Sequence, residues 1–293
     1  MKIALMWMGC LLMQTASAVT VKDDAGHLIT LTQPAQRVVS LAPHATELLF
    51  AAGGAERVVG VVAHSDFPAE AKRIPVVGDS RQIDIERLLA LRPDLLVVWL
   101  HGSSARQLEQ LQQLGIPLFY SEPHTLDEIP DSVARLGQLL GTEAVAAKRA
   151  SELRQTLSML AARYKGRPTV RMFYQVWSKP LYTLNGRHIV SDAIRLCGGE
   201  NIFDRLATTA PIVNIEAVLQ ENPEAIVTGS NLQQTETGLA LWNNYPTLQA
   251  VKNKNLFAVD ADLLNRAGPR LIDGTAALCE KLDLARSHRS ATR

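Results

Sequence analysis

The sequence has almost no excess of charge of either sign. The sequence has 30 Lys and Arg residues and 29 Asp and Glu residues, which gives a formal net charge of +1 over 293 residues. A chain without a basic field has no general electrostatic attraction for nucleic acid, and no acidic tail is present to attract a basic partner. Charge therefore indicates no polymeric partner, and we expect no binding to nucleic acid.

The common signatures of enzymes are also missing. The sequence contains no Gly-x-Ser-x-Gly, no Gly-x-Gly-x-x-Gly and no phosphate-binding loop. Gly78-Asp79-Ser80 matches the start of a serine-esterase motif. That motif, however, belongs at the beginning of its domain and needs a late Asp-x-x-His, which Asp283 and His288 do not supply. We expect no catalysis, and a secreted hydrolase that uses Ser80 is the alternative from another class of protein.

Clustered metal ligands are lacking as well. The seven histidines are scattered singly, without the i,i+4 pair that a zinc site uses. We therefore expect no metal site and no cofactor. His64, His101 and His124 each follow an expected strand, so an axial contact to a metal that is already held in a macrocycle stays open.

Long apolar runs are confined to the start of the chain. Lys2 precedes the apolar run 3–13, and Ala16-Ser17-Ala18 fits a small-x-small cleavage pattern. Residues 1–18 are therefore predicted to be a signal peptide, which makes the protein an exported one. No later run reaches the roughly 18 to 20 residues that span a bilayer, so we expect the mature chain to be soluble.

Cysteine is scarce, and removal of the signal peptide leaves Cys197 and Cys279. In an exported protein such a pair is most simply a disulfide, and two buried free thiols are the alternative.

A long amphipathic helix is predicted over residues 143–164. Apolar residues recur there at steps of four and three, and neither Pro nor Gly interrupts the pattern before Gly166. At 1.5 Å per residue this helix is roughly 33 Å long, enough to cross a small domain.

Similar sequence lies on both sides of this helix. Residues 84–98 align without a gap with 214–228, and residues 49–56 echo 194–201. Each half alternates strands with helices, which predicts an α/β fold of two Rossmann-like lobes, each with a parallel or mixed sheet, joined by one long α-helix. We place the N-terminal lobe at 19–126, the connecting helices at 127–165, the C-terminal lobe at 166–285 and a frayed tail at 286–293. The cleft between the lobes is the expected binding site.

Several blocks of the chain together resemble a known family. The blocks, in order, are 37–48 (RVVSLAPHATEL), 64–68 (HSDFP), 85–86 with 92–95 (IE and RPDL), 197–203 (CGGENIF) and 265–270 (NRAGPR). They resemble the periplasmic solute-binding proteins of ABC importers, in the class (class III) with a single helical backbone between the lobes. The resemblance implies a monomeric periplasmic receptor that captures a small molecule and delivers it to an ABC importer permease dimer in the inner membrane. It is strongest to members that bind a corrinoid such as cobalamin (vitamin B12).

The resemblance also implies roles for individual residues. His64 stands at an aromatic position that contacts the corrinoid, and Trp99 matches a tryptophan that lines the site. The run from Asp262 to Arg266 stands where the family contacts the corrin ring and its amides. Both end residues are retained, leucines replace bulky residues at Leu263 and Leu264, and Asn265 completes the run. Cys197 and Cys279 match the family's disulfide.

Glu86 and Glu216 match the two acidic residues, one in each lobe, that dock onto arginines of the permease. They also occupy equivalent places in the 84–98 and 214–228 repeats, so a receptor with pseudo-two-fold symmetry would present matched carboxylates to a two-fold permease. The simpler interpretation is that both are ordinary first-turn glutamates, which a helix N-terminus favours.

Two departures from the family's pattern bear on the ligand. Ser80 replaces a tryptophan and His64 replaces a tyrosine, so a smaller or differently ligated corrinoid is an open alternative. Second-lobe aromatic residues are expected to serve in part as contacts and in part as core, namely Trp177, Tyr182 and Trp242. This class also suggests two other ligands. One is haem, with His64 or His101 as the iron ligand. The other is a ferric siderophore, whose anionic oxygens would bind Arg81, Arg106 or Arg266.

Overall fold

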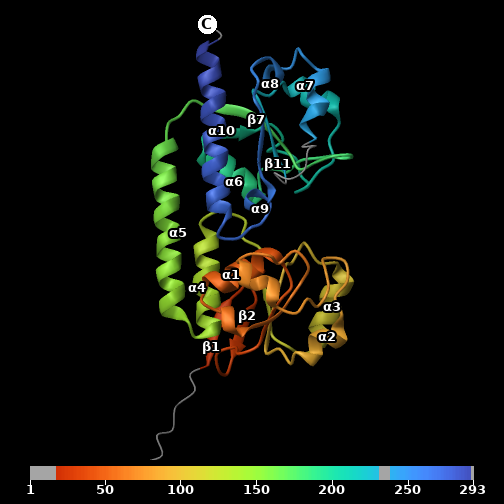
Figure 1. The fold of residues 1–293 in the computed structure, drawn as a ribbon, viewed down its shortest axis with the longest axis vertical. Helices are drawn as coiled ribbons and strands as arrows, with labels where there is room; N and C mark the ends of the chain where they lie inside the picture. Colours follow the sequence, from red (N-terminus) through yellow and green to blue (C-terminus); the bar gives the residue numbers. More distant parts are fainter. Residues whose placement is uncertain (1–17, 231–237, 292–293) are drawn as a thin grey trace, which may run out of the picture.

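The computed structural model describes residues 18–230 and 238–291, and the predicted signal peptide lies outside them except for its last residue. The described residues form two α/β lobes, one above the other along the long axis (Figure 1). The first lobe holds β1 Val19–Lys22, β2 Leu28–Leu31, β3 Val38–Ser40, α1 Pro43–Ala51, β4 Val58–Val61, α2 Ile85–Ala90, β5 Leu95–Val98, α3 Ala105–Gln113 and β6 Leu118–Tyr120.

Two helices, α4 Glu128–Leu140 and α5 Glu143–Tyr164, lead to the second lobe. That lobe holds β7 Val170–Gln175, β8 Trp177–Ser178, β9 Leu181–Tyr182, α6 Ile189–Leu196, β10 Gly199–Asn201, α7 Ile215–Glu221, β11 Ala225–Ser230, α8 Gln249–Lys252, β12 Leu256–Asp260, α9 Ala261–Leu264 and α10 Leu271–Ala291. Short 3-10 helices lie at Ala55–Arg57, Ala69–Arg73 and Leu239–Asn244.

The two main sheets have the same topology. Their strand orders are β4-β3-β5-β6 and β10-β7-β11-β12, and every neighbouring pair within them is parallel. In each sheet, therefore, the chain forms a central strand, crosses to one edge, returns to the other side of the centre and continues outward. The predicted fold class is confirmed.

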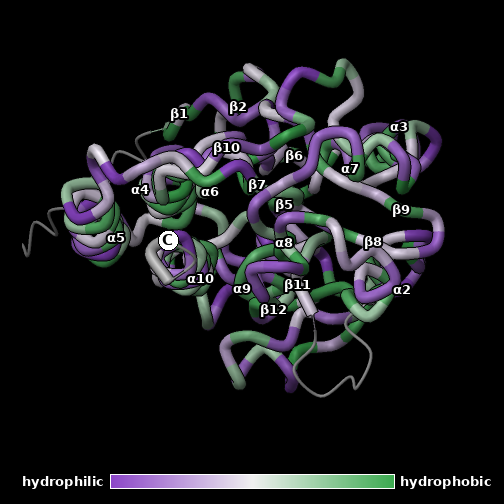
Figure 2. The backbone as a smooth tube through the Cα atoms, turned by 90° about the horizontal axis from the view of Figure 1, so that it is seen from above, coloured by the Kyte–Doolittle hydropathy of each residue, from purple (hydrophilic) through white to green (hydrophobic). Residues whose placement is uncertain are grey.

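Side chains of the central strands point alternately to the two faces of each sheet, and this divides the core into layers. On β5, Leu95 and Val97 face one cluster of buried residues, and Leu96 and Val98 face another. The cluster of Leu95 and Val97 continues through α4 and α5 to the second lobe, where Val170 of β7 and Val227 of β11 belong to it. The opposite faces of the two sheets have separate clusters, which α2 and α3 cover in the first lobe and α7 and α8 in the second. In both views α2, α3 and α7 lie on the side opposite α5 (Figures 1 and 2).

The internal repeat extends to the backbone. Asp84 caps α2 by accepting the N–H of Arg87, and Asn214 caps α7 by accepting the N–H of Ala217. Each repeat has a residue with φ of 45° directly before its proline, at positions 92 and 222. The two halves therefore share hydrogen bonding and turn geometry as well as sequence.

The long predicted helix has the expected bounds, because α5 spans Glu143–Tyr164. Its buried residues, Ala146, Ala150, Leu153, Leu157 and Tyr164, are members of the predicted apolar stripe. The helix contacts α4 at the first lobe and both α6 and α10 at the second. It is thus packed against both lobes over its length.

The end of the chain differs from the expectation. Residues 286–291, predicted to be frayed, belong to α10, while 292–293 lie outside the described residues. Arg286 donates to the carbonyls of Pro168 and Cys197, and Arg289 pairs with Glu224. The arginines that suggested a solvated tail instead bind the helix to the second lobe.

Cys197 and Cys279 form the expected disulfide, which joins the end of α6 to α10 across 82 residues of sequence. Among the described residues, no helix is long and apolar enough to cross a membrane.

Candidate functional site

The residues predicted to bind the ligand follow the carboxyl ends of strands. Those strand ends face each other between the lobes. His64 follows β4 and Trp99 follows β5 in the first lobe, and Asp262 to Arg266 follow β12 in the second. In parallel α/β sheets this edge is where ligands bind. The surface formed by the loops at these strand ends, which includes His64, Trp99 and Asp262 to Arg266, is called the interlobe surface.

Trp99 is held in one orientation by its neighbours. Its ring meets the ring of His44 edge-on, with centroids 5.5 Å apart. A Cβ added to Gly102 would lie 1.9 Å from Cε3 of Trp99, so the indole packs directly on the backbone of Gly102. Trp99 remains 37% exposed. A partly exposed indole backed by a histidine and a glycine offers a flat apolar face to a ligand.

His44, beneath Trp99, is buried on α1. Its Nε2 is 3.2 Å from the carbonyl of Ser121, an arrangement in which Nε2–H donates. Burial is the largest influence and lowers the pKa of His44, while the Ser121 carbonyl and the nearby carboxylates of Glu122 and Asp24 act in the opposite direction. The neutral ring therefore supports Trp99 at neutral pH.

The loop that carries Trp99 has a further support. His101 donates its backbone N–H to Glu122, and its Nδ1 lies 2.5 Å from the same oxygen of that carboxylate. Glu122 in turn donates its N–H to Asp24 in the turn between β1 and β2, and Asp24 pairs with Arg135 of α4. The N-terminal hairpin therefore stabilises the strand-end loop from behind.

A group of five charged residues joins the lobes, and sequence reasoning missed most of it. Arg266 contacts three carboxylates, Asp66 at 2.6 Å, Asp262 at 2.9 Å and Glu47 at 3.5 Å. Glu47 also accepts two hydrogen bonds from Arg270. These residues, Glu47, Asp66, Asp262, Arg266 and Arg270, are called the interlobe charge cluster below.

Two further contacts bring the lobes together at the cluster. The guanidinium of Arg270 lies over the ring of Phe67, 4.0 Å from its centroid. A Cβ added to Gly268 would lie 3.2 Å from Oε2 of Glu47, so the second lobe approaches α1 closely. The sequence signal for the missed residues was their presence in three of the blocks that resemble the family, 37–48, 64–68 and 265–270.

Asn265 is placed by its own lobe. Its Oδ1 accepts a hydrogen bond of 2.7 Å from the hydroxyl of Tyr174, whose pKa is raised by burial. Leu263 is partly exposed, whereas Leu264 is 1% exposed and belongs to the core. We expected both leucines to contact the ligand, but the single turn of α9 directs Leu264 inward.

The remaining aromatic candidates separate clearly by burial. Trp242 is fully buried and donates Nε1–H to Gln175, so it is a core residue. Trp177, the first residue of β8, is 63% exposed, and Tyr182 pairs with it across the β8–β9 hairpin. His64 is exposed, with φ of 66°.

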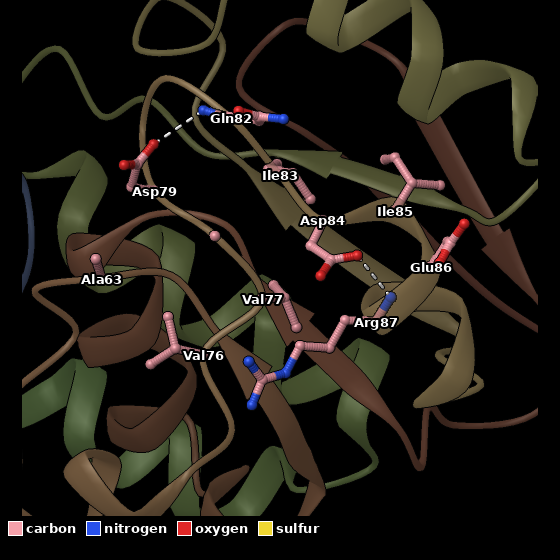
Figure 3. A pocket seen from close by; sticks show the side chains of 11 residues that line it. Ala63, Val76, Val77, Asp79, Gln82, Ile83, Asp84, Ile85, Glu86 and Arg87 are labelled. Carbon is pink, nitrogen blue, oxygen red and sulfur yellow. Dashed lines mark hydrogen bonds between the residues drawn. The ribbon is translucent and has the colours of Figure 1, made fainter.

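Glu86 and Glu216 lie at equivalent places, each the second residue of its helix and each exposed. Glu86 lines a surface hollow of about 650 Å³ between the 76–83 segment and α2 (Figure 3). Asp79 at its rim accepts the N–H groups of Arg81 and Gln82, and these two bonds are the largest causes of its lowered pKa. The carboxylate of the Gly78-Asp79-Ser80 motif is thus engaged in a turn.

No cluster of three or more His, Cys, Asp or Glu side chains suited to a metal ion occurs within residues 18–230 and 238–291.

Comparison with known proteins places the chain in a family. Residues 38–263 match the periplasmic binding protein family. The chain belongs to this family. It is 35% identical to the vitamin B12-binding protein of Vibrio parahaemolyticus over 89% of this chain and 94% of that protein. The crystal structure of the periplasmic vitamin B12-binding protein of Vibrio cholerae matches with a TM-score of 0.80 at 38% identity, covering 86% of this chain and 98% of that one. A periplasmic haem-binding protein of Pseudomonas aeruginosa matches with a TM-score of 0.72 at 27% identity, over 84% and 91% of the two chains.

Proposed function

We propose that this chain is a periplasmic receptor that captures a corrinoid, cobalamin or a close relative, between its lobes and delivers it to an ABC importer of the inner membrane. The match to vitamin B12-binding proteins along almost the whole of both chains carries the proposal. The function is binding and transfer, so the ligand leaves chemically unchanged and no cofactor is needed.

Exposed apolar side chains at the strand ends fit a large macrocycle. Trp99 and Phe67 in the first lobe and Trp177 in the second are all more than one third exposed. Large aromatic surfaces that stay exposed beside a cleft gain free energy when a flat ligand covers them. In the proposed complex Trp99 and Trp177 contact the corrin ring, and His64 and Leu263 contact its edge.

Polar contacts come from the segment after β12. Asp262, Asn265 and Arg266 lie within five residues of one another, and each is at least partly accessible. Corrinoids carry side-chain amides that both donate and accept hydrogen bonds, and these three residues offer complementary groups. Leu264 is left out of the proposed contact set because it is buried.

Titration of the ligand-free mature protein tests the function. Cobalamin and cobinamide should bind at low micromolar concentration or better by calorimetry, and haem and a ferric siderophore at least tenfold more weakly. Trp242→Phe, which alters only the core, is a control for folding, and light scattering on the same sample checks the expected monomer. Tight binding of haem or siderophore without corrinoid binding would overturn the proposal in favour of another receptor of this family.

We also propose that Glu86 and Glu216 dock onto the permease. They lie at the N-termini of repeat-related helices, on the ends of the lobes that carry the strand-end loops, and both are exposed. An equivalent carboxylate on each lobe suits a partner with two-fold symmetry.

The lobes, at 19–126 and 166–285, should move little about the connection at 127–165. The long helix α5 packs against α4, which contacts α1 and β1 of the first lobe, and against α6 and α10 of the second lobe. The interlobe charge cluster joins the lobes a second time. Two separate attachments restrict a hinge more than one does. We expect solution scattering to give nearly the same radius of gyration with and without cobalamin, and a large decrease would contradict this.

A further inference from the structure

The interlobe charge cluster contains more carboxylates than arginines. Glu47, Asp66 and Asp262 supply three negative charges against the two positive charges of Arg266 and Arg270. Every salt bridge in the cluster is 3.5 Å or shorter. The cluster therefore neutralises its arginines within the protein and keeps an excess of one negative charge.

Glu47 is 1% exposed, and exposure differs between the two arginines and the two aspartates of the cluster. The side chains of Arg266 and Arg270 are 13% and 17% exposed, whereas those of Asp66 and Asp262 are 43% and 38% exposed. A molecule that approaches this part of the interlobe surface therefore meets carboxylate oxygens first, with the guanidinium groups largely covered. Carboxylate oxygens accept hydrogen bonds and donate none.

Asp66 is the more exposed of the two first-lobe carboxylates that contact Arg266. It lies 2.6 Å from Nη1 of Arg266, the same nitrogen that approaches Glu47. Burial opposes ionisation of Asp66, but the hydrogen bond and the charge of Arg266 outweigh it and hold its pKa below the ordinary value. The Asp66 carboxylate is thus ionised at neutral pH and occupies a position that an anionic ligand group would need.

From these observations we infer that Asp66 is a specificity-determining residue, which makes the site select neutral ligands rich in N–H donors, such as peripheral amides, and reject ligands that carry carboxylates. The inference rests on the proposed function and deepens it. An amide can donate its N–H to the exposed oxygens of Asp66 and Asp262, whereas a carboxylate in the same place meets like charge and finds the arginines already paired. Haem with its propionates and anionic siderophores would be rejected by the same charges.

A pair of ligands with equal shape and different charge tests this inference. The first is the corrin ring with all of its peripheral side chains as amides, and the second is the same ring with those side chains as carboxylates. For the wild-type protein at pH 7.5 we expect the carboxylate form to bind at least a hundredfold more weakly. Asp66→Asn should reduce this ratio at least tenfold, mainly by tighter binding of the carboxylate form, because it removes a negative charge and frees a guanidinium N–H.

Asp131→Asn is the matched control. Asp131 is also an exposed aspartate paired with an arginine, Arg154 at 2.5 Å, but it lies on α4 in neither the strand-end loops nor the interlobe charge cluster. It changes the net charge by the same amount and should leave the ratio as in the wild type. Thermal melts of both variants check that they fold.

The possible outcomes separate the two proposals. If the wild-type protein bound both corrins equally, or if Asp66→Asn and Asp131→Asn gave the same ratio, the role of Asp66 would be refuted and corrinoid binding would stand. If the wild-type protein bound neither corrin, the proposed function would be refuted, and this inference with it. If the Asp66→Asn variant bound haem more tightly than the wild-type protein does, a second anionic ligand would support the role of the Asp66 charge.

Discussion

The carboxylate of Glu47 accepts two hydrogen bonds from the guanidinium of Arg270, at 2.6 Å from Nη2 and 3.1 Å from Nε. The two residues are 223 positions apart, one on α1 and the other directly before α10. Paired planar groups of this kind are stronger and more directional than single ion contacts. The contact joins the second lobe to the first directly, in addition to the connection through α5.

Replacement of Glu47 by Gln should destabilise the protein by about 3 kcal/mol, because Arg266 and Arg270 would lose a partner in a site where the carboxylate is 1% exposed. Urea denaturation followed by circular dichroism measures this loss. Glu152→Gln is the control, since Glu152 pairs with Arg149 while both are about half exposed, and should cost less than about 0.5 kcal/mol. Equal losses for the two variants would contradict the structural role of Glu47.

Trp99→Ala should weaken corrinoid binding at least tenfold, because a buried aromatic contact is worth a few kcal/mol. Gly102→Ala should have a comparable effect without removing the ring, since the new Cβ would lie 1.9 Å from Cε3 of Trp99 and displace the indole. Calorimetric titration with cobalamin measures both. Ser103→Ala, in the same loop, is the control, and an unchanged affinity in Gly102→Ala would show that the position of Trp99 is unimportant.

Reversal of both docking carboxylates, Glu86→Arg with Glu216→Arg, should abolish stimulation of the importer's ATPase and leave cobalamin affinity unchanged. Charge reversal places like charge against the arginines expected on the permease. The control reverses one exposed glutamate in each lobe away from the docking helices, Glu56 and Glu280. Transport that continues in the double variant at the wild-type rate would exclude this docking surface.

Acidification should destabilise the protein through His188. Burial, with a smaller contribution from nearby His124, lowers the pKa of His188 from 6.5 to about 4. Between these values the unfolded chain binds the proton and the folded chain does not, so the free energy of unfolding falls as the pH falls through this window. The total loss is at most about 3 kcal/mol.

His188→Asn provides the test, because asparagine can still accept the N–H of Val190 at the start of α6 but does not titrate. The free energy of unfolding, measured from pH 7 to 4, should depend less steeply on pH in the variant. Buried His44, whose pKa is also lowered, keeps part of the slope. An identical pH dependence in the two proteins would show that His188 is not the group responsible.

The features that could be predicted from the sequence were local or periodic along the chain. The bounds of α5 follow from its apolar stripe, and the related lobes follow from the repeats at 84–98 and 214–228, because spacing along the chain dictates both. The pairing of Cys197 with Cys279 was also predictable, since only these two of the three cysteines lie outside the predicted signal peptide.

Contacts that depend on tertiary packing could not be predicted. Glu47 and Asp66 meet Arg266 across at least 200 residues, and no spacing rule joins them. The orientation of Leu264 depends on one turn of helix after β12, where a shift of one residue exchanges core and surface. In the same way, composition does not distinguish the buried Trp242, in the 3-10 helix Leu239–Asn244, from the exposed Trp177 at the start of β8.

The cluster of buried residues that runs from β5 through α5 to β11 has a consequence for unfolding. Two lobes would ordinarily be independent folding units, each able to melt by itself. Here Val97 and Val227 belong to one continuous apolar cluster, so neither sheet can lose its covering helices without exposing part of the other lobe's core to water. The apolar core is therefore separate in the two lobes beneath α2, α3, α7 and α8 but continuous along α4 and α5, and the two halves should denature together in a single cooperative transition.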